Sequence, residues 1–169
     1  CICNIDTSDE LLDKVLNEVQ TKGRSLMMIY SKKIRNAYII CFNAHKDDYD
    51  KAGYPYVFHP FFLASQMDDE DATIVALLHD VIEDHGDKYD LNFLMKEGMG
   101  EKVCCAIDLL THKKGEPYMD HIKKIKVNPI ARKVKIADLK HNSDIQRLDG
   151  QHHPKYELYQ EALEYLESD

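Results

Sequence analysis

The segment TIVALLHDVIEDHG at residues 73–86 carries four ionisable side chains, His79, Asp80, Glu83 and Asp84, in a stretch whose apolar residues predict a buried helix. Side chains four positions apart lie on the same face of a helix, which pairs His79 with Glu83 and Asp80 with Asp84. Burying unpaired charges is costly. The pattern therefore predicts that an ion or a ligand lies beside this helix and compensates for them.

A bound metal ion fits these residue types. It attracts carboxylates and prefers a neutral imidazole. A cation with His and Asp ligands keeps room for a water molecule, and bound water is a better nucleophile than bulk water. A neighbouring carboxylate could then transfer protons. The segment thus indicates hydrolytic chemistry at a metal ion.

His79 and Asp80 would need further ligands from elsewhere in the chain. His59 lies twenty positions earlier in YPYVFHP, and Asp138 interrupts the apolar stripe of VKIADLKHN. The four residues together make a set of two nitrogens and two oxygens that suits Mn²⁺, Fe²⁺, Mg²⁺ or Zn²⁺.

Each of these residues also has a structural explanation when it is taken alone. A histidine before proline commonly starts a helix, as His59 would, and an isolated aspartate such as Asp138 is usually solvated or caps a helix. Glu83 and Asp84 at a helix end would commonly be a solvated pair, although carboxylates are unfavourable near a helix C-terminus. The combination and its order, more than any single residue, favour a metal site.

Helical periodicity dominates the rest of the chain, and alternating runs rich in valine or threonine are nearly absent. Pro60 and Pro129 suit first helical positions, while Gly53 and Pro55 mark a loop. Helices are expected at 7–22, 31–46, 59–67, 68–84, 91–97, 100–112, 118–126, 129–148 and 155–167. The pattern predicts an all-α, single-domain bundle of about eight or nine helices over residues 1–169, in which 155–167 is a packing or homodimer element.

Composition excludes several other classes. The 169 residues carry a net charge of −8, with 44% hydrophobic and 31% charged residues, which fits a globular domain. The acidic balance argues against a nucleic-acid binder. No apolar run approaches the ~18 residues that span a bilayer. Five cysteines without a disulfide-like framework favour a reducing compartment, so we expect a cytoplasmic protein. The absence of an initiating Met suggests that the start of the chain is missing.

Three motifs, AHKDDYDKAGYPYVFHP, ALLHDVIED and VKIADLKHN, follow one another in the order His, His-Asp, Asp. This order resembles the signature of the HD superfamily of metal-dependent phosphohydrolases. The motifs are further similar to the hydrolase domain of RelA/SpoT-type alarmone enzymes and to the stand-alone small alarmone hydrolases, including the metazoan type. The resemblance covers residues 30–148.

The resemblance implies an all-α fold with one Mn²⁺-like ion and a nucleotide substrate. The reaction it implies removes the 3′-pyrophosphate of (p)ppGpp and gives GDP or GTP and pyrophosphate. By motif position, the metal ligands would be His59, His79, Asp80 and Asp138, the catalytic acidic pair Glu83 and Asp84, and the substrate-binding residues Lys51 and Asn142.

The sequence departs from the alarmone enzymes at three positions. Asp50, Leu139 and Asp144 stand where those enzymes commonly carry arginine, a residue suited to bidentate phosphate contacts. Lys140 or Arg147 could compensate. Two alternatives therefore stay open, a phosphohydrolase that acts on another nucleotide and a nucleotide-sensing module without turnover. The intact acidic pair argues against the second.

Four other sites could bind or stack but have ordinary explanations. His45 matches a recurrent histidine of the alarmone branch and is expected to pack or to anchor a loop rather than to bind metal. Tyr118 could stack on a base, but a buried tyrosine at a helix start is commoner. His141 could face the pocket or the solvent. His152 and His153 are expected to be exposed in a loop.

Overall fold

The structure is a computed structural model that describes residues 29–148 and 150–168. The predicted helix at 7–22 lies outside the described residues. Within the described residues every named element is helical, and the one isolated β-bridge joins Tyr49 to Pro55. The predicted all-α class is confirmed, whereas the boundaries of a single domain over 1–169 remain a prediction.

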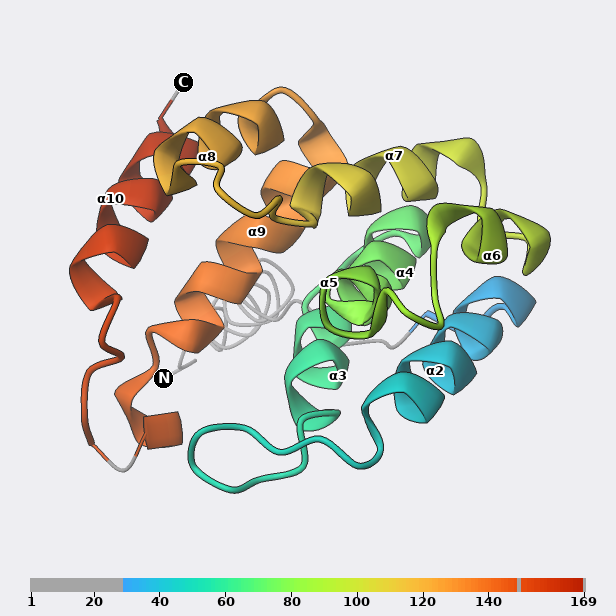
Figure 1. The fold of residues 1–169 in the computed structure, drawn as a ribbon, viewed down its shortest axis with the longest axis horizontal. Coiled ribbons are helices and arrows are strands. Elements are labelled where there is room, and N and C mark those ends of the chain that lie inside the picture. The colour runs from blue at the N-terminus through green and yellow to red at the C-terminus, as the bar shows by residue number, and fades with distance from the viewer. Residues whose placement is uncertain (1–28, 149, 169) are drawn as a thin grey trace, which may run out of the picture.

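The helices follow the predicted order closely (Figure 1). They are α2 (Lys32–His45), α3 (Phe58–Ser65), α4 (Glu70–Leu78), α5 (Val81–His85), α6 (Leu91–Lys96), α7 (Glu101–Leu110), α8 (Tyr118–Lys126), α9 (Pro129–Asn142), the 3₁₀ helix η1 (Ile145–Leu148) and α10 (Tyr156–Glu167). Side chains cap the starts of several helices because they accept hydrogen bonds from otherwise unpaired backbone N–H groups. These caps are Ser31, Asp69, Asp90 and Asn128.

The prediction of one helix over 68–84 is wrong. The chain forms α4 and α5, with His79 and Asp80 at the junction between them. Asp80 has φ −98° and ψ −10°, away from regular helical values, although the N–H of Asp84 still donates to its carbonyl at 2.9 Å. The bend therefore falls at the two residues that were expected to bind metal.

The prediction of one helix over 129–148 is also too long. Helix α9 ends at Asn142, and the N–H of Ser143 donates to the carbonyl of Leu139 at 3.0 Å. The side chain of Asp144 then accepts from the N–H of Gln146 at 2.9 Å, which starts η1 as a separate turn. In α3, Pro60 occupies the third helical position instead of the first, still within the turn whose N–H groups have no helical partner.

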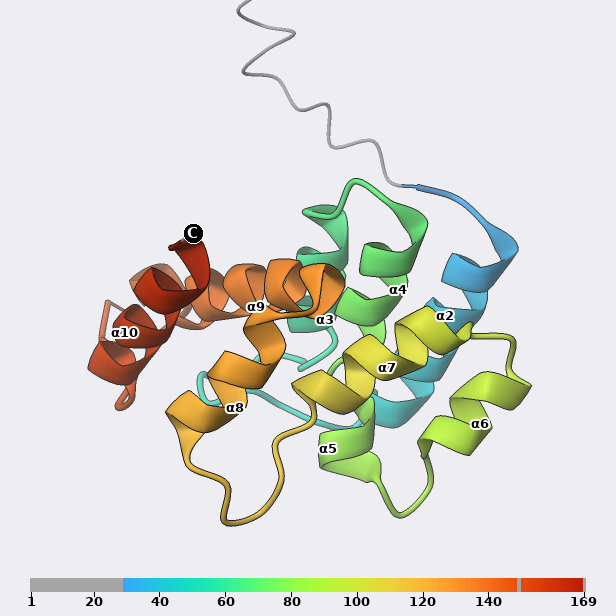
Figure 2. The same ribbon diagram turned by 90° about the horizontal axis from the view of Figure 1, so that it is seen from above.

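Helix α4 lies at the centre of the molecule. Its residues from Ala72 to Leu78 are all buried, and it contacts α2, α3, α7 and α9. A helix that is apolar on every side is stable only when other elements surround it. Figure 2 shows α8, α9 and α10 on one side of α4, and α2 and α6 on the other. This arrangement carries the end of α4, and with it His79, into the interior.

Helix α10 packs against α8 and α9, with Ala162 and Leu166 fully buried. The prediction of a packing element at 155–167 is thus confirmed, and a homodimer remains a prediction. Among the described helices, none combines the length and the apolar character needed to cross a membrane.

Candidate metal-binding active site

The four expected metal ligands come from three parts of the fold. His59 lies in α3, His79 and Asp80 form the junction of α4 and α5, and Asp138 lies in α9. The side chains of His59 and His79 are each 3% exposed and that of Asp138 is 6% exposed, whereas that of Asp80 is 25% exposed. Packing of α3 and α9 on α4 brings residues about eighty positions apart in sequence to one point.

The ligand atoms of these residues converge. His59 Nε2 lies 3.3 Å from His79 Nε2 and 3.2 Å from Asp138 Oδ1. His79 Nε2 lies 2.9 Å from Asp80 Oδ2 and 4.0 Å from Asp138 Oδ1. His59, His79 and Asp80 could hold a metal ion between them, and Asp138 adds a carboxylate oxygen beside both imidazoles.

Hydrogen bonds determine which nitrogen of each histidine faces the cluster. His79 Nδ1 donates to the carbonyl of Ala76 at 2.9 Å, which leaves the lone pair of the neutral ring on Nε2. Arg147 Nη1 lies 3.1 Å from His141 Nδ1, and a guanidinium can only donate, so His141 Nδ1 accepts. The same atom lies 2.7 Å from His59 Nδ1, which must therefore donate. Neutral His59 then also presents the lone pair of Nε2.

This arrangement fits a cation. Two lone pairs that face each other at 3.3 Å repel unless a positive charge lies beside them. Burial acts to lower the pKa of His79, but Asp80 and Asp138 raise it to about 9, so the cluster attracts a proton or another cation. Burial, His59 and Arg147 together lower the pKa of His141 to about 3, which keeps this ring a neutral acceptor.

Neighbouring side chains hold the two carboxylates in place. Asp138 Oδ2 accepts from Lys135 Nζ at 2.8 Å, and Asp138 Oδ1 accepts from Asn142 Nδ2 at 2.6 Å. Burial acts to raise the pKa of Asp138, but Lys135 and His59 hold it well below its usual range. The hydroxyl of Tyr56 donates to Asp80 Oδ2. Such partners of metal ligands fix their orientation.

The two residues of the expected catalytic pair have different partners. Glu83 Oε2 accepts from the backbone N–H of His112 at 2.8 Å and ties α5 to the turn after α7. Asp84 lines a pocket of about 470 Å³ together with Tyr56 and His85. Burial, Asp80 and Glu83 raise the pKa of Asp84 to about 6. Asp84 is therefore a carboxylate of raised pKa that lines a pocket.

Lys51 and Asn142, expected to bind substrate, lie on a second pocket of about 260 Å³. Its lining residues are Tyr49, Asp50, Lys51, Tyr56, Asn142, Arg147 and His153. This pocket shares Tyr49 and Tyr56 with the pocket of Asp84. Because Asn142 bonds Asp138 and Tyr56 bonds Asp80, the lining of the pocket reaches the candidate metal cluster directly.

The structure also explains the positions that depart from the family pattern. Arg147 Nη2 lies 3.3 Å from Asp50 Oδ2, so this arginine offsets the acidic residue in the loop. Lys140 pairs with Glu167 at 2.7 Å and does not compensate. Leu139 is 1% exposed and belongs to the core, and Asp144 lines a different pocket, beside Lys140 and His141.

Three functional contacts were not predicted from sequence. Lys135 lies three residues before Asp138 on α9, and this helical spacing could have indicated the pair. Tyr56 was part of a quoted motif, but its bond to Asp80 spans 24 positions. Arg147 was expected only as one of two residues that could compensate for the missing arginines, and no local pattern marks its contact with Asp50, 97 positions away.

No family model matches the chain. Over 77 residues the chain is 36% identical to the bifunctional (p)ppGpp synthase/hydrolase SpoT of Escherichia coli strain K12. This match covers 43% of the chain and 11% of that relative. Over 86 residues it is 31% identical to the guanosine-3′,5′-bis(diphosphate) 3′-pyrophosphohydrolase of Aquifex aeolicus strain VF5. This match covers 48% of the chain and 12% of that relative. The chain thus spans a small part of the curated relatives it matches.

The fold is similar to a solved structure of a metazoan ortholog of SpoT, which is described as hydrolyzing ppGpp and playing a role in starvation responses. The TM-score is 0.65 at 21% identity, and the match covers 83% of this chain and 88% of that one. The sequence matches confirm the resemblance to RelA/SpoT-type hydrolases, and the structural match confirms the all-α fold.

Proposed function

We propose that this chain is a metal-dependent nucleotide phosphohydrolase that removes the 3′-pyrophosphate of (p)ppGpp. The observation that carries the proposal is the convergence of His59, His79, Asp80 and Asp138 beside a pocket that Lys51 and Asn142 line. The activities for which the relatives in Escherichia coli and Aquifex aeolicus are named support this substrate.

The four converging residues would hold one divalent cation, which we propose to be Mn²⁺. Two carboxylates and two imidazoles give a mixed set that suits Mn²⁺ or Fe²⁺ as well as Zn²⁺. When bound, such an ion polarises a phosphoryl oxygen and lowers the pKa of a bound water. Lys135 and Asn142 bond Asp138, Tyr56 bonds Asp80, and these bonds would hold the two carboxylates in place for the ion.

Asp84 is proposed to accept the proton of the attacking water. A carboxylate with a pKa of about 6 is mostly ionised at neutral pH and is more basic than an exposed aspartate. Glu83 would act with it from the preceding position, and its bond to the backbone of His112 holds α5 against the turn after α7. The acidic pair thus combines one residue that moves a proton with one that also holds the element in place.

Positive charge in the pocket of Lys51 would bind the phosphates. Lys51 and Arg147 both line it, and the pairing of Arg147 with Asp50 keeps that aspartate from repelling an anion. Tyr49, 68% exposed, lies where the two pockets meet and offers a ring on which a base could stack. A nucleotide would extend across both pockets, since a drug-sized ligand commonly needs ~300 Å³ or more.

One observation favours a second candidate, a phosphohydrolase that acts on another nucleotide. Leu139 is in the core and Asp144 lines a separate pocket, so neither supplies the cation that arginine brings at these positions in the alarmone enzymes. Fewer cations around the pocket would suit a substrate with fewer phosphates.

A nucleotide panel tests the substrate. Purified protein with Mn²⁺ would be incubated with ppGpp, pppGpp and deoxynucleoside monophosphates, and the products would be resolved as pyrophosphate or orthophosphate. Pyrophosphate from the alarmones alone is the expected result. Orthophosphate from a monophosphate would support a metal-dependent phosphohydrolase that acts on another nucleotide. No turnover with metal bound would favour a nucleotide-sensing module.

A further inference from the structure

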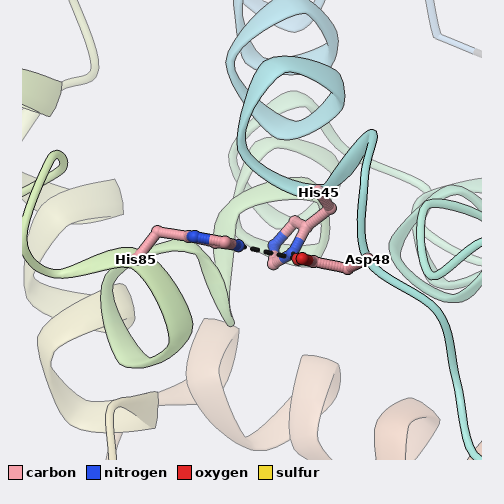
Figure 3. Close-up of side chains that lie close together, drawn as sticks. All are labelled: His45, Asp48 and His85. Atoms are coloured by element: carbon pink, nitrogen blue, oxygen red, sulfur yellow. Dashed lines mark hydrogen bonds and ion pairs between the residues drawn. The ribbon is translucent and has the colours of Figure 1, made fainter.

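A second group of metal-ligating side chains lies outside the cluster around His79. Among the described residues, His45, Asp48 and His85 form the other set whose ligand atoms all lie within 4.8 Å of one another. They come from three elements, since His45 ends α2, Asp48 lies in the loop that follows and His85 ends α5 (Figure 3).

The two imidazoles point at one carboxylate oxygen. Asp48 Oδ2 lies 2.8 Å from His45 Nδ1 and 2.7 Å from His85 Nε2. The two rings are 4.9 Å apart between centroids and inclined at 67°, so their nitrogens approach the oxygen from different directions. Three ligand atoms that converge from different directions give the geometry of a three-residue metal site.

Backbone hydrogen bonds and packing fix the positions of these residues. The N–H of Asp48 donates to the carbonyl of His45 at 3.1 Å, and the N–H of Tyr56 donates to the carbonyl of Asp48 at 3.0 Å. The ring of Tyr56 packs on the ring of His45 at 4.9 Å. His45 is almost fully buried, and its imidazole has little freedom to turn away. The set is therefore preformed, which lowers the entropic cost of binding an ion.

One side of the set stays open. The side chains of Asp48 and His85 are 35% and 19% exposed, and both line the pocket of about 470 Å³ that also contains Asp84. Two imidazoles and one carboxylate with a vacant position toward solvent match the ligand sets of zinc sites that keep a water. Imidazole-rich sets select Zn²⁺, Fe²⁺ or related ions over Mg²⁺ and Ca²⁺.

We propose that His45, Asp48 and His85 bind a second divalent transition-metal ion of the Zn²⁺ class, with its open position toward the pocket of Asp84. The proposal does not depend on the proposed substrate or on turnover. The pocket is lined by Asp47, Asp48, Tyr49, Tyr56, Asp84 and His85, a set with three carboxylates and neither lysine nor arginine. A cation at the open edge would offset this negative charge.

Metal content tests the proposal directly. The full chain would be stripped with a chelator, reloaded with Zn²⁺, passed through gel filtration and analysed for zinc per chain. Wild type is expected to retain about two equivalents, and His85→Gln and Asp138→Asn about one each. In a parallel titration, Co²⁺ should give a visible absorption band in Asp138→Asn that is absent when His85→Gln is added to the same chain.

His85→Gln is the matched variant because glutamine can still donate a hydrogen bond to Asp48 but is a poor metal ligand. Asp48→Asn serves as a second variant if His85→Gln does not keep the wild-type circular dichroism. His152→Gln, at an exposed loop histidine, controls for adventitious surface binding and should leave the count unchanged.

The proposal would be overturned if wild type retained one equivalent of zinc that is lost in Asp138→Asn and kept in His85→Gln. His45, Asp48 and His85 would then form a hydrogen-bonded triad that binds no metal. Two equivalents in both wild type and His85→Gln would also overturn it, since the second ion would lie elsewhere. Neither result would bear on hydrolysis at the cluster of His79, so the two proposals fail separately.

Discussion

At the scale of single residues, a relay of hydrogen bonds from Arg147 through His141 to His59 sets the nitrogen that faces the metal cluster. Arg147→Ala removes the donor that makes His141 an acceptor. We expect the affinity for Mn²⁺ to fall about 10–100-fold, as is typical when the partner of a metal-ligating histidine is removed. Isothermal titration calorimetry with Mn²⁺ would measure this affinity in wild type and in the variant.

The matched control for Arg147→Ala is Asp50→Asn. It removes the charge of the ion pair at 3.3 Å and leaves the bonds of Arg147 to His141 and Asn142 in place. Asp50→Asn should therefore keep the affinity of wild type. Equal affinities in wild type and Arg147→Ala would show that the tautomer of His59 does not depend on this relay.

Protonation of Asp84 is expected to produce the acidic limb of the pH–rate profile. Burial, Asp80 and Glu83 raise its pKa to about 6, and a cation held by Asp80 would offset the second of these causes, so the base is lost and the rate should decline as pH falls through about 6 and below. Asp84→Asn should lower kcat by about 10²–10⁴-fold and abolish this limb. Steady-state rates measured from about pH 5 to about pH 8 would check both expectations. A wild-type profile that is flat from about pH 8 down to about pH 5 would contradict the role of Asp84 as base.

The same shift has a consequence for stability. A carboxyl group whose pKa is higher in the folded state than in the unfolded state destabilises the fold once it is ionised. The penalty is absent below the unfolded pKa, near 3.8, and is fully present above the folded pKa of about 6. Because Asp84 is exposed enough to be screened, Asp84→Asn should stabilise the protein at pH 7.5 by no more than about 1 kcal/mol. Urea unfolding at the two extremes of pH would measure the difference.

At the scale of elements, helix α4 supports the site because it is buried on all sides. Leu77 is fully buried two residues before His79. Leu77→Ala should cost about 2–5 kcal/mol of unfolding free energy, measured with urea. The control Met95→Ala, at a residue that is 48% exposed on α6, should stay within about 0.5 kcal/mol. A cost below about 1 kcal/mol for Leu77→Ala would mean that α4 is not the centre of packing.

The elements show where sequence patterns suffice. Helix α2 begins after its capping Ser31 as periodicity predicts, because the capping bond is local. The break between α4 and α5 could not be predicted, since the apolar pattern continues from Leu78 to Val81. Asp80 at the break contacts Tyr56 and His79, and the partner from before α3 lies 24 positions away. Local propensity carries no information about such a contact.

At the scale of the whole molecule, the motifs predicted which residues lie together, and the structure shows the contacts that hold them there. His59, His79, Asp80 and Asp138 converge as expected. The bond between His59 and His141, 82 positions apart, and the pair of Arg147 with Asp50 depend on the packing of α3, α9 and the loop before α3. These contacts exist only once the helices have assembled, so sequence patterns could not reveal them.

Metal removal should lower the stability of the assembled fold. An ion that binds only the folded state at about 100 times its Kd stabilises by about 2.7 kcal/mol, which corresponds to about 5–10 °C in Tm for a chain of this size. We expect Mn²⁺ to raise the Tm of the chelator-treated protein by this amount in a calorimetric scan. In Asp138→Asn the shift should be much smaller, and an equal shift in that variant would place the stabilising ion elsewhere.

The most direct test of the central claim is the Mn²⁺ dependence of pyrophosphate release from ppGpp, measured on wild type and on His79→Ala. The account predicts that chelator-treated wild type is inactive, that added Mn²⁺ activates it to saturation, and that His79→Ala stays inactive while its circular dichroism remains helical. Pyrophosphate release that persists in His79→Ala, or that does not respond to Mn²⁺ in wild type, would contradict the account.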